Sequence, residues 1–375
     1  MPSTEVVVTR AFEFAQRQVE SLVQAYPDYY PMYTVQGKWK REGELWTHWC
    51  DGFLPGQMWL FYEITAEPRW REWAERYSAK LEPRKDDRDV HDLGFIFYHG
   101  TYKRWYDMTV VEGKPNEALN DVVVHAGKTL AKRFKTAGNY LRSFISDESL
   151  FIDIMMNVPI ILYAALEEND PDMMELAIQH CLTTRRTLLR GDGSTSHEGI
   201  FDTQTGAFLR QTTHQGYRGD SCWSRGLAWS LYGFATCYRL TQMGEFLQSS
   251  QANADFFIEN CPEGGVAPWD FDAPDSGDLS ISQPDTSASA IAACGLLELA
   301  QLTPDSARSV LYRSYAHQIV ESLCGKEYLA SGTPGWEGVL KRGVYHIHKG
   351  LGVDESVAFG EYFFVEALTR VLSGQ

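Results

Sequence analysis

The sequence predicts an all-α fold in which six helical hairpins form a closed toroid. Three observations lead to this prediction. Apolar residues recur with helical periodicity along most of the chain, whereas the alternation typical of strands is scarce. Several links between the expected helices are very short, and short links join antiparallel neighbours. An aspartate also recurs at the start of six segments, about once per hairpin.

Twelve segments of the 375-residue chain have helical periodicity. Pro68 and Pro171 each begin one after a two-residue link, and proline suits a first turn because its missing N–H would be unpaired there anyway. Pro159 falls inside another segment, six residues after Asp153, and predicts either a kinked helix or an irregular approach to the helix at Asp153. The expected helices are 5–26, 53–65, 68–82, 92–107, 115–135, 152–168, 171–190, 220–240, 243–260, 285–301, 304–325 and 355–373.

Six aspartates open alternate segments at separations of 41, 61, 67, 65 and 69 residues, which indicates a structural repeat. One interpretation is N-capping, in which the carboxylate accepts backbone N–H bonds. Asp220, Asp285 and Asp354 fit it, because Ser or Thr follows each within two residues. The other interpretation is a shared functional cleft. The six are Asp51, Asp92, Asp153, Asp220, Asp285 and Asp354.

The pattern of polarity separates two rings of helices. The segment 287–296 is small or apolar nearly all round, which is typical of a buried inner helix, whereas 68–82 carries one charged face, as an outer helix would. No Pro/Gly/Ser-rich linker interrupts the chain, so we expect one domain over residues 1–375. No stretch is long and apolar enough for a membrane span. With no visible signal peptide and seven cysteines without paired spacing, we expect a cytoplasmic protein with reduced thiols and no zinc site.

Charge and aromatic content narrow the class of ligand. A formal net charge of −16 argues against nucleic acid, whose phosphates require Lys and Arg, and any anionic ligand must meet a local basic patch. Aromatic residues make up 13% of the chain. Five tryptophans fall in the long segments expected to precede the inner helices, which favours a carbohydrate cleft at that end of the toroid: Trp39, Trp46, Trp49, Trp269 and Trp336.

Two aspartates are candidates for acid/base chemistry. Asp153 precedes Pro159, with Asn157 four residues on, and Asp92 is followed by Gly94, which would allow a close approach. Two carboxylates from different hairpins that face one cavity can hold different pKa values. Such a pair suits proton transfer at a glycosidic or enol-ether bond.

Other polar residues could bind a ligand. Arg225 and Trp229 are four residues apart and share a helix face, so they could hold a carboxylate and a sugar ring, or simply stack on each other. His197 is either a hydrogen-bonding loop residue or a ligand contact. The stretch from Tyr345 to Lys349 is basic, and we interpret its histidines, His346 and His348, as polar contacts and not metal ligands.

Four motifs, spread in order over nearly the whole chain, resemble the unsaturated glucuronyl hydrolases of glycoside hydrolase family 88. They are His91-Asp-Leu-Gly-Phe, Asp153-x-Met-Met-Asn-x-Pro, His214-Gln-Gly-Tyr followed by Asp220-Ser-x-Trp-x-Arg-Gly-x-Ala-Trp, and Lys349-Gly-x-Gly-Val-Asp-Glu-Ser. The resemblance implies an (α/α)6 barrel. It also implies hydration of the C4=C5 bond in a Δ4,5-unsaturated uronic acid at the non-reducing end of lyase-generated oligosaccharides of the glycosaminoglycan type.

The resemblance also implies roles for residues. Asp153 corresponds to the acid/base that protonates C4 and activates water for attack at C5, and Asp92 to a second essential carboxylate. A further family aromatic is expected near residue 138, where this chain offers only Tyr140. No metal or organic cofactor is implied. Residues that would line the sugar are His197, Gln215, Arg225, Trp229, Trp46, Tyr345 and Lys349.

Several alternatives stay open. An unsaturated rhamnogalacturonyl or ulvan-type hydrolase would use the same barrel and reaction class on other fragments. A polysaccharide lyase on a related toroid would create the double bond and would need a Tyr/His or Lys base. A non-catalytic sugar-binding barrel would bind without turnover. The segment 326–353 is expected to decide whether sulfated partners are accepted, and the sequence gives no oligomeric state.

Overall fold

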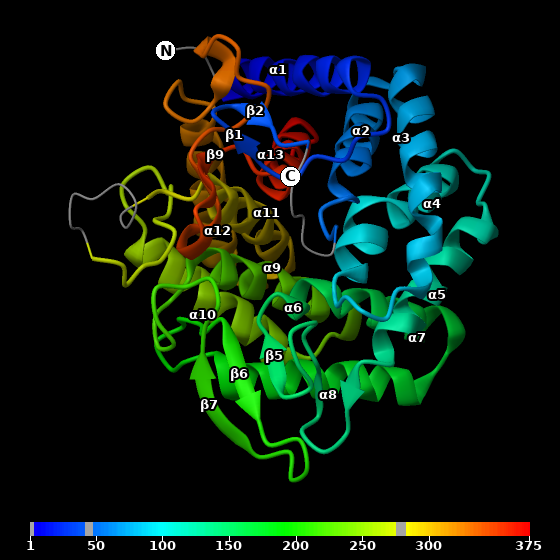
Figure 1. Cartoon of the computed structure of the whole chain (residues 1–375), viewed down its shortest axis with the longest axis vertical. Coiled ribbons are helices and arrows are strands. Elements are labelled where there is room, and N and C mark those ends of the chain that lie inside the picture. Colours follow the sequence, from blue (N-terminus) through cyan, green and yellow to red (C-terminus); the bar gives the residue numbers. More distant parts are fainter. Residues whose placement is uncertain (1–3, 42–47, 275–282) are drawn as a thin grey trace.

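The computed structural model describes residues 4–41, 48–274 and 283–375, and its helices form an (α/α)6 barrel (Figure 1). The inner helices are α2 (Phe53–Thr65), η2 (Gly94–Gly100) with α4 (Tyr102–Val111), α6 (Ile154–Asn157) with α7 (Pro159–Glu168), α9 (Ser224–Thr241), α11 (Thr286–Leu302) and α13 (Ala358–Leu372). The outer helices are α1 (Thr4–Ala25), α3 (Pro68–Leu81), α5 (Glu117–Ala131), α8 (Pro171–Leu188), α10 (Gly244–Asn260) and α12 (Ser306–Leu323). All twelve expected segments are therefore helical.

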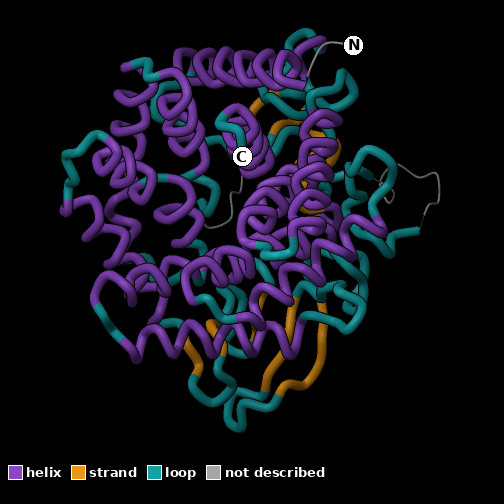
Figure 2. The backbone as a smooth tube through the Cα atoms, turned by 180° about the vertical axis from the view of Figure 1, so that it is seen from behind, coloured by secondary structure: helices purple, strands orange, loops and turns teal. Residues whose placement is uncertain are grey.

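The inner helices close a ring. Each contacts the next in chain order, and α13 at the end of the chain contacts α2 near its beginning. The outer helices pack against this ring, with α1 along the top of Figure 1, α3 and α5 on the right and α8 toward the bottom. The view from behind shows the same helical shell, with short strands both at the bottom and in the upper part of the view (Figure 2).

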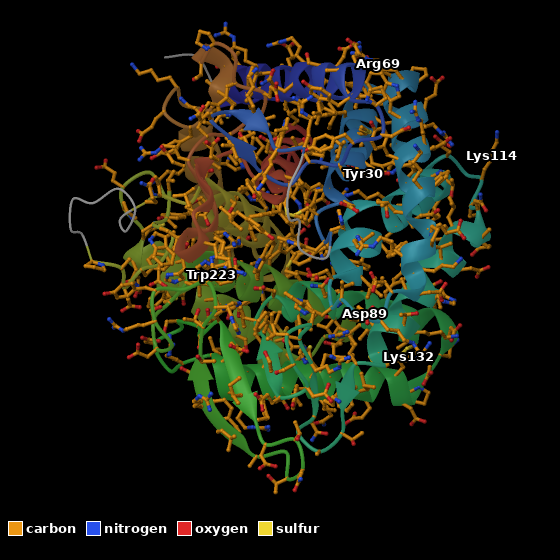
Figure 3. The ribbon with its side chains drawn as sticks, viewed as in Figure 1. Tyr30, Arg69, Asp89, Lys114, Lys132 and Trp223 are labelled. Atoms are coloured by element: carbon orange, nitrogen blue, oxygen red, sulfur yellow. The ribbon has the colours of Figure 1, made fainter. Side chains whose placement is uncertain are left out.

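Glycine residues allow neighbouring inner helices to approach one another closely. A Cβ added to Gly233 of α9 would lie 2.4 Å from the Met155 carbonyl oxygen, and one added to Gly295 of α11 would lie 2.2 Å from Leu231. Residues 286–300 of α11 are buried all round, as its small and apolar sequence predicts. Lys114 is exposed and extends from the rim in Figure 3, whereas Trp223 is buried within the molecule.

The capping interpretation holds for only one of the three aspartates that fitted it. Asp285 caps α11 by accepting from the Ser287 N–H at 3.0 Å. For Asp220 and Asp354 the prediction was wrong, because α9 and α13 begin several residues later, after extended N-cap residues. Asp220 instead pairs with Arg218 at 2.6 Å, and Asp354 with Arg342 at 3.3 Å.

Of the two arrangements predicted around Pro159, the kinked helix is confirmed, since α6 ends at Asn157 and α7 begins at Pro159. The segment 92–107 was expected as one helix, but it is the π-helix η2 followed by α4, with the non-helical Thr101 (φ −126°, ψ −90°) between them. Among the described residues, no helix is long and apolar enough to cross a membrane.

The segments before the inner helices contain short antiparallel strands that are too brief for alternation to be visible in the sequence. They are β1 (Thr34–Val35) with β2 (Lys38–Trp39), β3 (Phe134–Lys135) with β4 (Tyr140–Leu141), β5 (Ser149–Phe151) with β6 (Glu198–Phe201) and β7 (Phe208–Thr212), and β8 (Gly343–His346) with β9 (Leu351–Glu355). Phe151 lies opposite Glu198, and the Ile152 N–H donates to the His197 carbonyl at 2.9 Å. This register brings Asp153 beside His197.

Candidate active site

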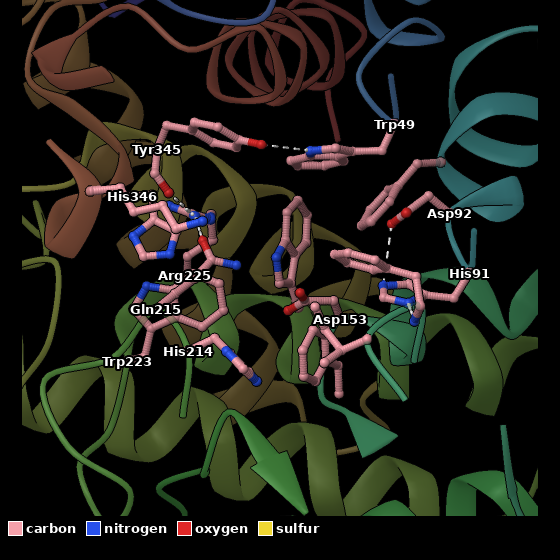
Figure 4. A pocket seen from close by; sticks show the side chains of 16 residues that line it. Trp49, His91, Asp92, Asp153, His214, Gln215, Trp223, Arg225, Tyr345 and His346 are labelled. Atoms are coloured by element: carbon pink, nitrogen blue, oxygen red, sulfur yellow. Dashed lines mark hydrogen bonds and ion pairs between the residues drawn. The ribbon is translucent and has the colours of Figure 1, made fainter. Parts of the chain in front are cut away.

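A cavity of about 450 Å³ opens among the segments that lead into the inner helices (Figure 4). Both candidate carboxylates, Asp92 and Asp153, line it. Aromatic rings and basic side chains make up most of the remaining wall. The other lining residues are Trp49, His91, Phe95, Phe144, Ile145, Phe151, His214, Gln215, Trp223, Arg225, Trp229, Tyr345, His346 and Lys349.

The two carboxylates are poorly solvated. Asp92 is 5% exposed, ahead of η2, and Asp153 is 9% exposed, at the start of α6. Burial raises the pKa of Asp153 to about 7, while the nearby Arg225 lowers it by less. Burial and then the charge of Asp153 raise the pKa of Asp92 to about 8. Both groups therefore hold protons near neutral pH, as an acid catalyst requires.

The hydrogen bonds of His197 define which of its nitrogens carries the proton. Its Nδ1 accepts from the backbone N–H groups of His214 and Gln215 at 3.1 and 3.3 Å. Burial, followed by the charges of His214 and Arg225, lowers the pKa of His197 well below its ordinary value, so the ring is neutral. Its proton then lies on Nε2, which faces Asp153 Oδ2 at 4.0 Å.

His91 repeats this arrangement at the other carboxylate. Its Nδ1 accepts from the Phe144 N–H at 3.0 Å, and its Nε2 lies 3.4 Å from Asp92 Oδ1. Burial lowers the pKa of His91 well below its ordinary value. Each carboxylate of the cavity thus faces the N–H of a neutral imidazole (Figure 4 shows the contact between His91 and Asp92).

Arg225 is a buried cation held within the wall. Its guanidinium donates to Asp285 Oδ2 at 3.1 Å, Gln215 Oε1 at 2.7 Å and the Tyr345 carbonyl at 2.8 Å, and also to the carbonyl of Val344. It lies over the ring of Trp223, 4.4 Å from the centroid. These contacts tie α9 and α11 to the β8 strand and orient the Gln215 amide.

Basic groups line the wall opposite the carboxylates. Lys349 lies in the turn between β8 and β9, and His346 ends β8. His214 Nε2 contacts the buried carboxylate of Glu198 at 3.2 Å, and this hydrogen bond raises the pKa of His214. Burial lowers the pKa of His346 to about 4, so this ring is neutral, and the local positive charge that an anionic ligand needs comes from Lys349 and His214.

The sequence profile of Glycosyl Hydrolase Family 88 matches residues 15–299. The chain belongs to this family. The match spans most of the barrel, from α1 to the end region of α11.

Individual proteins of family 88 are similar to this chain over most of its length. The unsaturated glucuronyl hydrolase of Bacillus sp. (strain GL1) is 34% identical over 339 residues, which cover 88% of this chain and 87% of the relative. The crystal structure of the enzyme from Bacillus sp. GL1 superposes with a TM-score of 0.89 over 98% of this chain and 97% of its own, at 31% identity. A variant of the Streptococcus agalactiae enzyme, complexed with dGlcA-GalNAc6S, covers 99% of this chain and 93% of its own, at 26% identity and a TM-score of 0.83.

Most of the site residues expected from the sequence of this family 88 chain meet in the one cavity. One described residue, His197, does not line it as expected. His197 lies behind the wall, fully buried, with its ring against Phe151 and Trp223. Trp46 lies outside the described residues. Those that line the cavity are Asp92, Asp153, Gln215, Arg225, Trp229, Tyr345 and Lys349.

The alternative interpretation, in which Arg225 stacks on Trp229, was wrong about the ring that Arg225 contacts. The guanidinium stacks on Trp223 and Phe359 instead, because α9 begins at Ser224 and Trp223 is an extended N-cap residue. Trp229 is left against Phe95 in the cavity wall, 4.8 Å between centroids.

Sequence reasoning missed Phe144 of the wall, and it named Trp49 only as one of five tryptophans expected at a carbohydrate cleft. Tyr140 stacks on Phe201 at 4.2 Å and does not line the cavity, so the ring from this segment is Phe144, four residues later. Trp49 also lines the cavity, whereas Trp39 and Trp269 are buried in the core. A loop has no periodicity that would show which way its rings point. Trp223 had a signal, since it falls within the third motif.

No three His, Cys, Asp or Glu side chains gather as metal ligands within residues 4–41, 48–274 and 283–375.

Proposed function

We propose that this chain is an unsaturated glucuronyl hydrolase. It removes a Δ4,5-unsaturated uronic acid from the non-reducing end of lyase-generated oligosaccharides of the glycosaminoglycan type, by hydration of the C4=C5 bond. The observation that carries the proposal is the pair of buried carboxylates, Asp92 and Asp153, facing one sugar-sized cavity with pKa values of about 8 and 7. The names of the relatives support the substrate class.

In the proposed reaction, Asp153 begins protonated and donates its proton to C4. Positive charge develops at C5 and the ring oxygen, and water attacks C5 while its proton returns to the Asp153 carboxylate. The resulting C5 hemiketal opens to a ketone, the ring oxygen becomes a hydroxyl on C1, and collapse at C1 releases the aglycone as an alcohol. One water is consumed across the double bond, and the carboxylic acid is regenerated.

The surrounding residues support this chemistry. The Nε2–H of His197 faces the carboxylate that forms when Asp153 gives up its proton. Asp92 hydrogen-bonds ring hydroxyls, and its proton, held by its high pKa, limits repulsion between the two carboxylates. Trp229, Trp49 and Phe144 offer faces to the sugar.

We further propose that the basic wall receives the anionic groups of the substrate. Gln215 and Lys349 point into the same cavity as the two carboxylates, and Tyr345 forms its far side beside Trp49. His348 contacts the Gly216 carbonyl at 2.7 Å and so acts on the turn, not on the ligand directly. Sulfate tolerance then depends on His346 and Lys349. The cytoplasmic location expected from the sequence stays a prediction.

The test is the ultraviolet absorbance of the conjugated double bond in unsaturated disaccharides from chondroitin, hyaluronan, heparin, pectin and ulvan. We expect the wild type to clear the signal of glycosaminoglycan fragments, and Asp153→Asn to be slower by about 10²–10⁴-fold. Clearance of pectin or ulvan fragments alone would move the chain to the rhamnogalacturonyl or ulvan-type activity. Binding without clearance of any fragment would contradict catalysis.

A further inference from the structure

Asn157 lies fully buried between the two elements that carry the carboxylates. Its Oδ1 accepts from the Phe95 N–H of η2 at 2.9 Å, and its Nδ2 donates to the Asp153 carbonyl at 3.2 Å. One side chain therefore binds the backbone of Asp153 and the backbone three residues after Asp92. Asn157 does not line the cavity and is not part of the proposed chemistry.

Two neighbouring contacts hold the same pair of elements together. A Cβ added to Gly94 would lie 2.5 Å from the Asn157 Cα, so only glycine allows η2 to approach α6 this closely. One residue before Asn157, the Met156 carbonyl lies 2.9 Å from Nε2 of His99, also on η2. Burial lowers the pKa of His99 to about 4, so this ring is neutral and donates from Nε2. The junction between η2 and α6 is thus closely packed.

We propose that Asn157 is a positioning residue for the reaction, which fixes the backbone of Asp153 relative to the segment that carries Asp92. The inference rests on the proposed function and deepens it. Positioning matters because displacement of a reacting group by about 1 Å can cost on the order of 10²-fold in rate. Helical hydrogen bonds alone cannot supply it, because α6 has only four residues and ends before Pro159.

The separation of the two carboxylates also sets their mutual repulsion. Asp153 faces Asp92, His197 and, on α9, Arg225. Asp92 faces a different set of groups besides Asp153, namely His91, Arg84, Arg133 and Asp87. If Asn157 holds the spacing, its loss shifts the titration of both aspartates, whereas a purely structural residue would change stability alone.

The variant is Asn157→Leu, which keeps the branched shape of the side chain, enlarges it and removes both hydrogen bonds. Asn120→Leu is the matched control, because Asn120 is buried on α5, donates to Glu167 at 2.6 Å and accepts from Tyr163 at 2.6 Å, away from the cavity. We expect both to lower Tm. Only Asn157→Leu should lower kcat, by about 10²-fold, with KM within about twofold of wild type.

A second measurement needs no turnover. The ¹³C resonances of the aspartate carboxyls are followed against pH in wild type, Asn157→Leu and Asn120→Leu, and assigned with Asp92→Asn and Asp153→Asn. We expect the midpoints of Asp92 and Asp153 to move only in Asn157→Leu. Unchanged midpoints together with a kcat equal to that of the control would overturn the positioning role. If the wild type itself clears no substrate, the proposed function fails, and the titration still decides the role of Asn157.

Discussion

His197 Nε2 lies 4.0 Å from Asp153 Oδ2, and the ring is held in the tautomer that places its proton on this nitrogen. Sequence spacing does not predict this contact, because the two residues are 44 positions apart along the chain. The pairing of β5 with β6 brings them together. At 4.0 Å the N–H points toward the carboxylate without a hydrogen bond, and the neutral ring does not compete for the proton of Asp153.

Replacement of His197 by leucine should slow the reaction. Loss of the donor leaves the Asp153 carboxylate less stabilised, so its pKa rises above about 7 and kcat falls by roughly 10–100-fold. The measurement is kcat against pH. The control is His180→Leu: His180 is also buried, and its Nδ1 accepts from the Leu141 N–H at 3.0 Å, but it does not line the cavity. Equal losses in both variants would mean that His197 acts only through stability.

Activity of the wild type should fall as pH rises through 7 to 8. Asp153, with a pKa of about 7, must begin protonated, and Asp92, with a pKa of about 8, follows it. The two titrate as a pair, so kcat/KM should be level below about pH 6 and decline above neutrality. A kcat/KM that rises between pH 7 and 9 would show instead that the reaction starts from the carboxylate form.

Asp92→Asn should make the protein more stable at alkaline pH. The folded-state pKa of about 8 exceeds the value of about 3.9 in unfolded chains, so the folded state binds more protons between these values and wild-type stability falls as pH rises through them. One pKa unit corresponds to about 1.4 kcal/mol, so we expect a gain above ~1 kcal/mol at pH 8.5 that disappears near pH 4. Urea unfolding at both pH values measures it. A gain of equal size at pH 4 and 8.5 would contradict this linkage.

Arg225→Met should destabilise the protein by about 3–5 kcal/mol, because it leaves the carboxylate of Asp285 buried without its cation. The double variant Arg225→Met/Asp285→Asn should regain part of this loss, since the second change removes the unpaired charge. It should not regain activity, because Gln215 and the β8 carbonyls still lose their donor. Urea unfolding measures the free energy of unfolding of both single variants and the double variant. A loss in the double variant equal to the sum of the two single losses would contradict this pairing.

The fold and the centre of the site could be predicted from the sequence for physical reasons. Helical periodicity, Pro68 and Pro171 defined helices, and motif spacing identified Asp92, Asp153, Arg225 and Trp229. The wall could not be predicted as well. Trp49 and Phe144 lie in segments without periodicity. The place of His197 behind Asp153 depends on the register of three-residue and four-residue strands, which have no alternation to reveal them.

The expected N-capping aspartates also show where prediction from local sequence fails. Asp285, Asp220 and Asp354 have similar local sequences, yet only Asp285 caps its helix. At the other two positions the tertiary pairing of the loop, with Trp223 opposite Asp270 and Val357 opposite Tyr33, sets where the helix begins. Local preference was overridden there by contacts from distant segments.

The central claim is that Asp153 hydrates the double bond before the aglycone leaves. One reaction should be followed at once by the ultraviolet absorbance of the C4=C5 bond and by the ¹H NMR anomeric signal of the released aglycone, with wild type and Asp153→Asn. We predict that absorbance loss precedes or matches aglycone release in the wild type, and that both slow by about 10²–10⁴-fold in the variant. Aglycone release ahead of absorbance loss, or equal rates in the two proteins, would contradict the account.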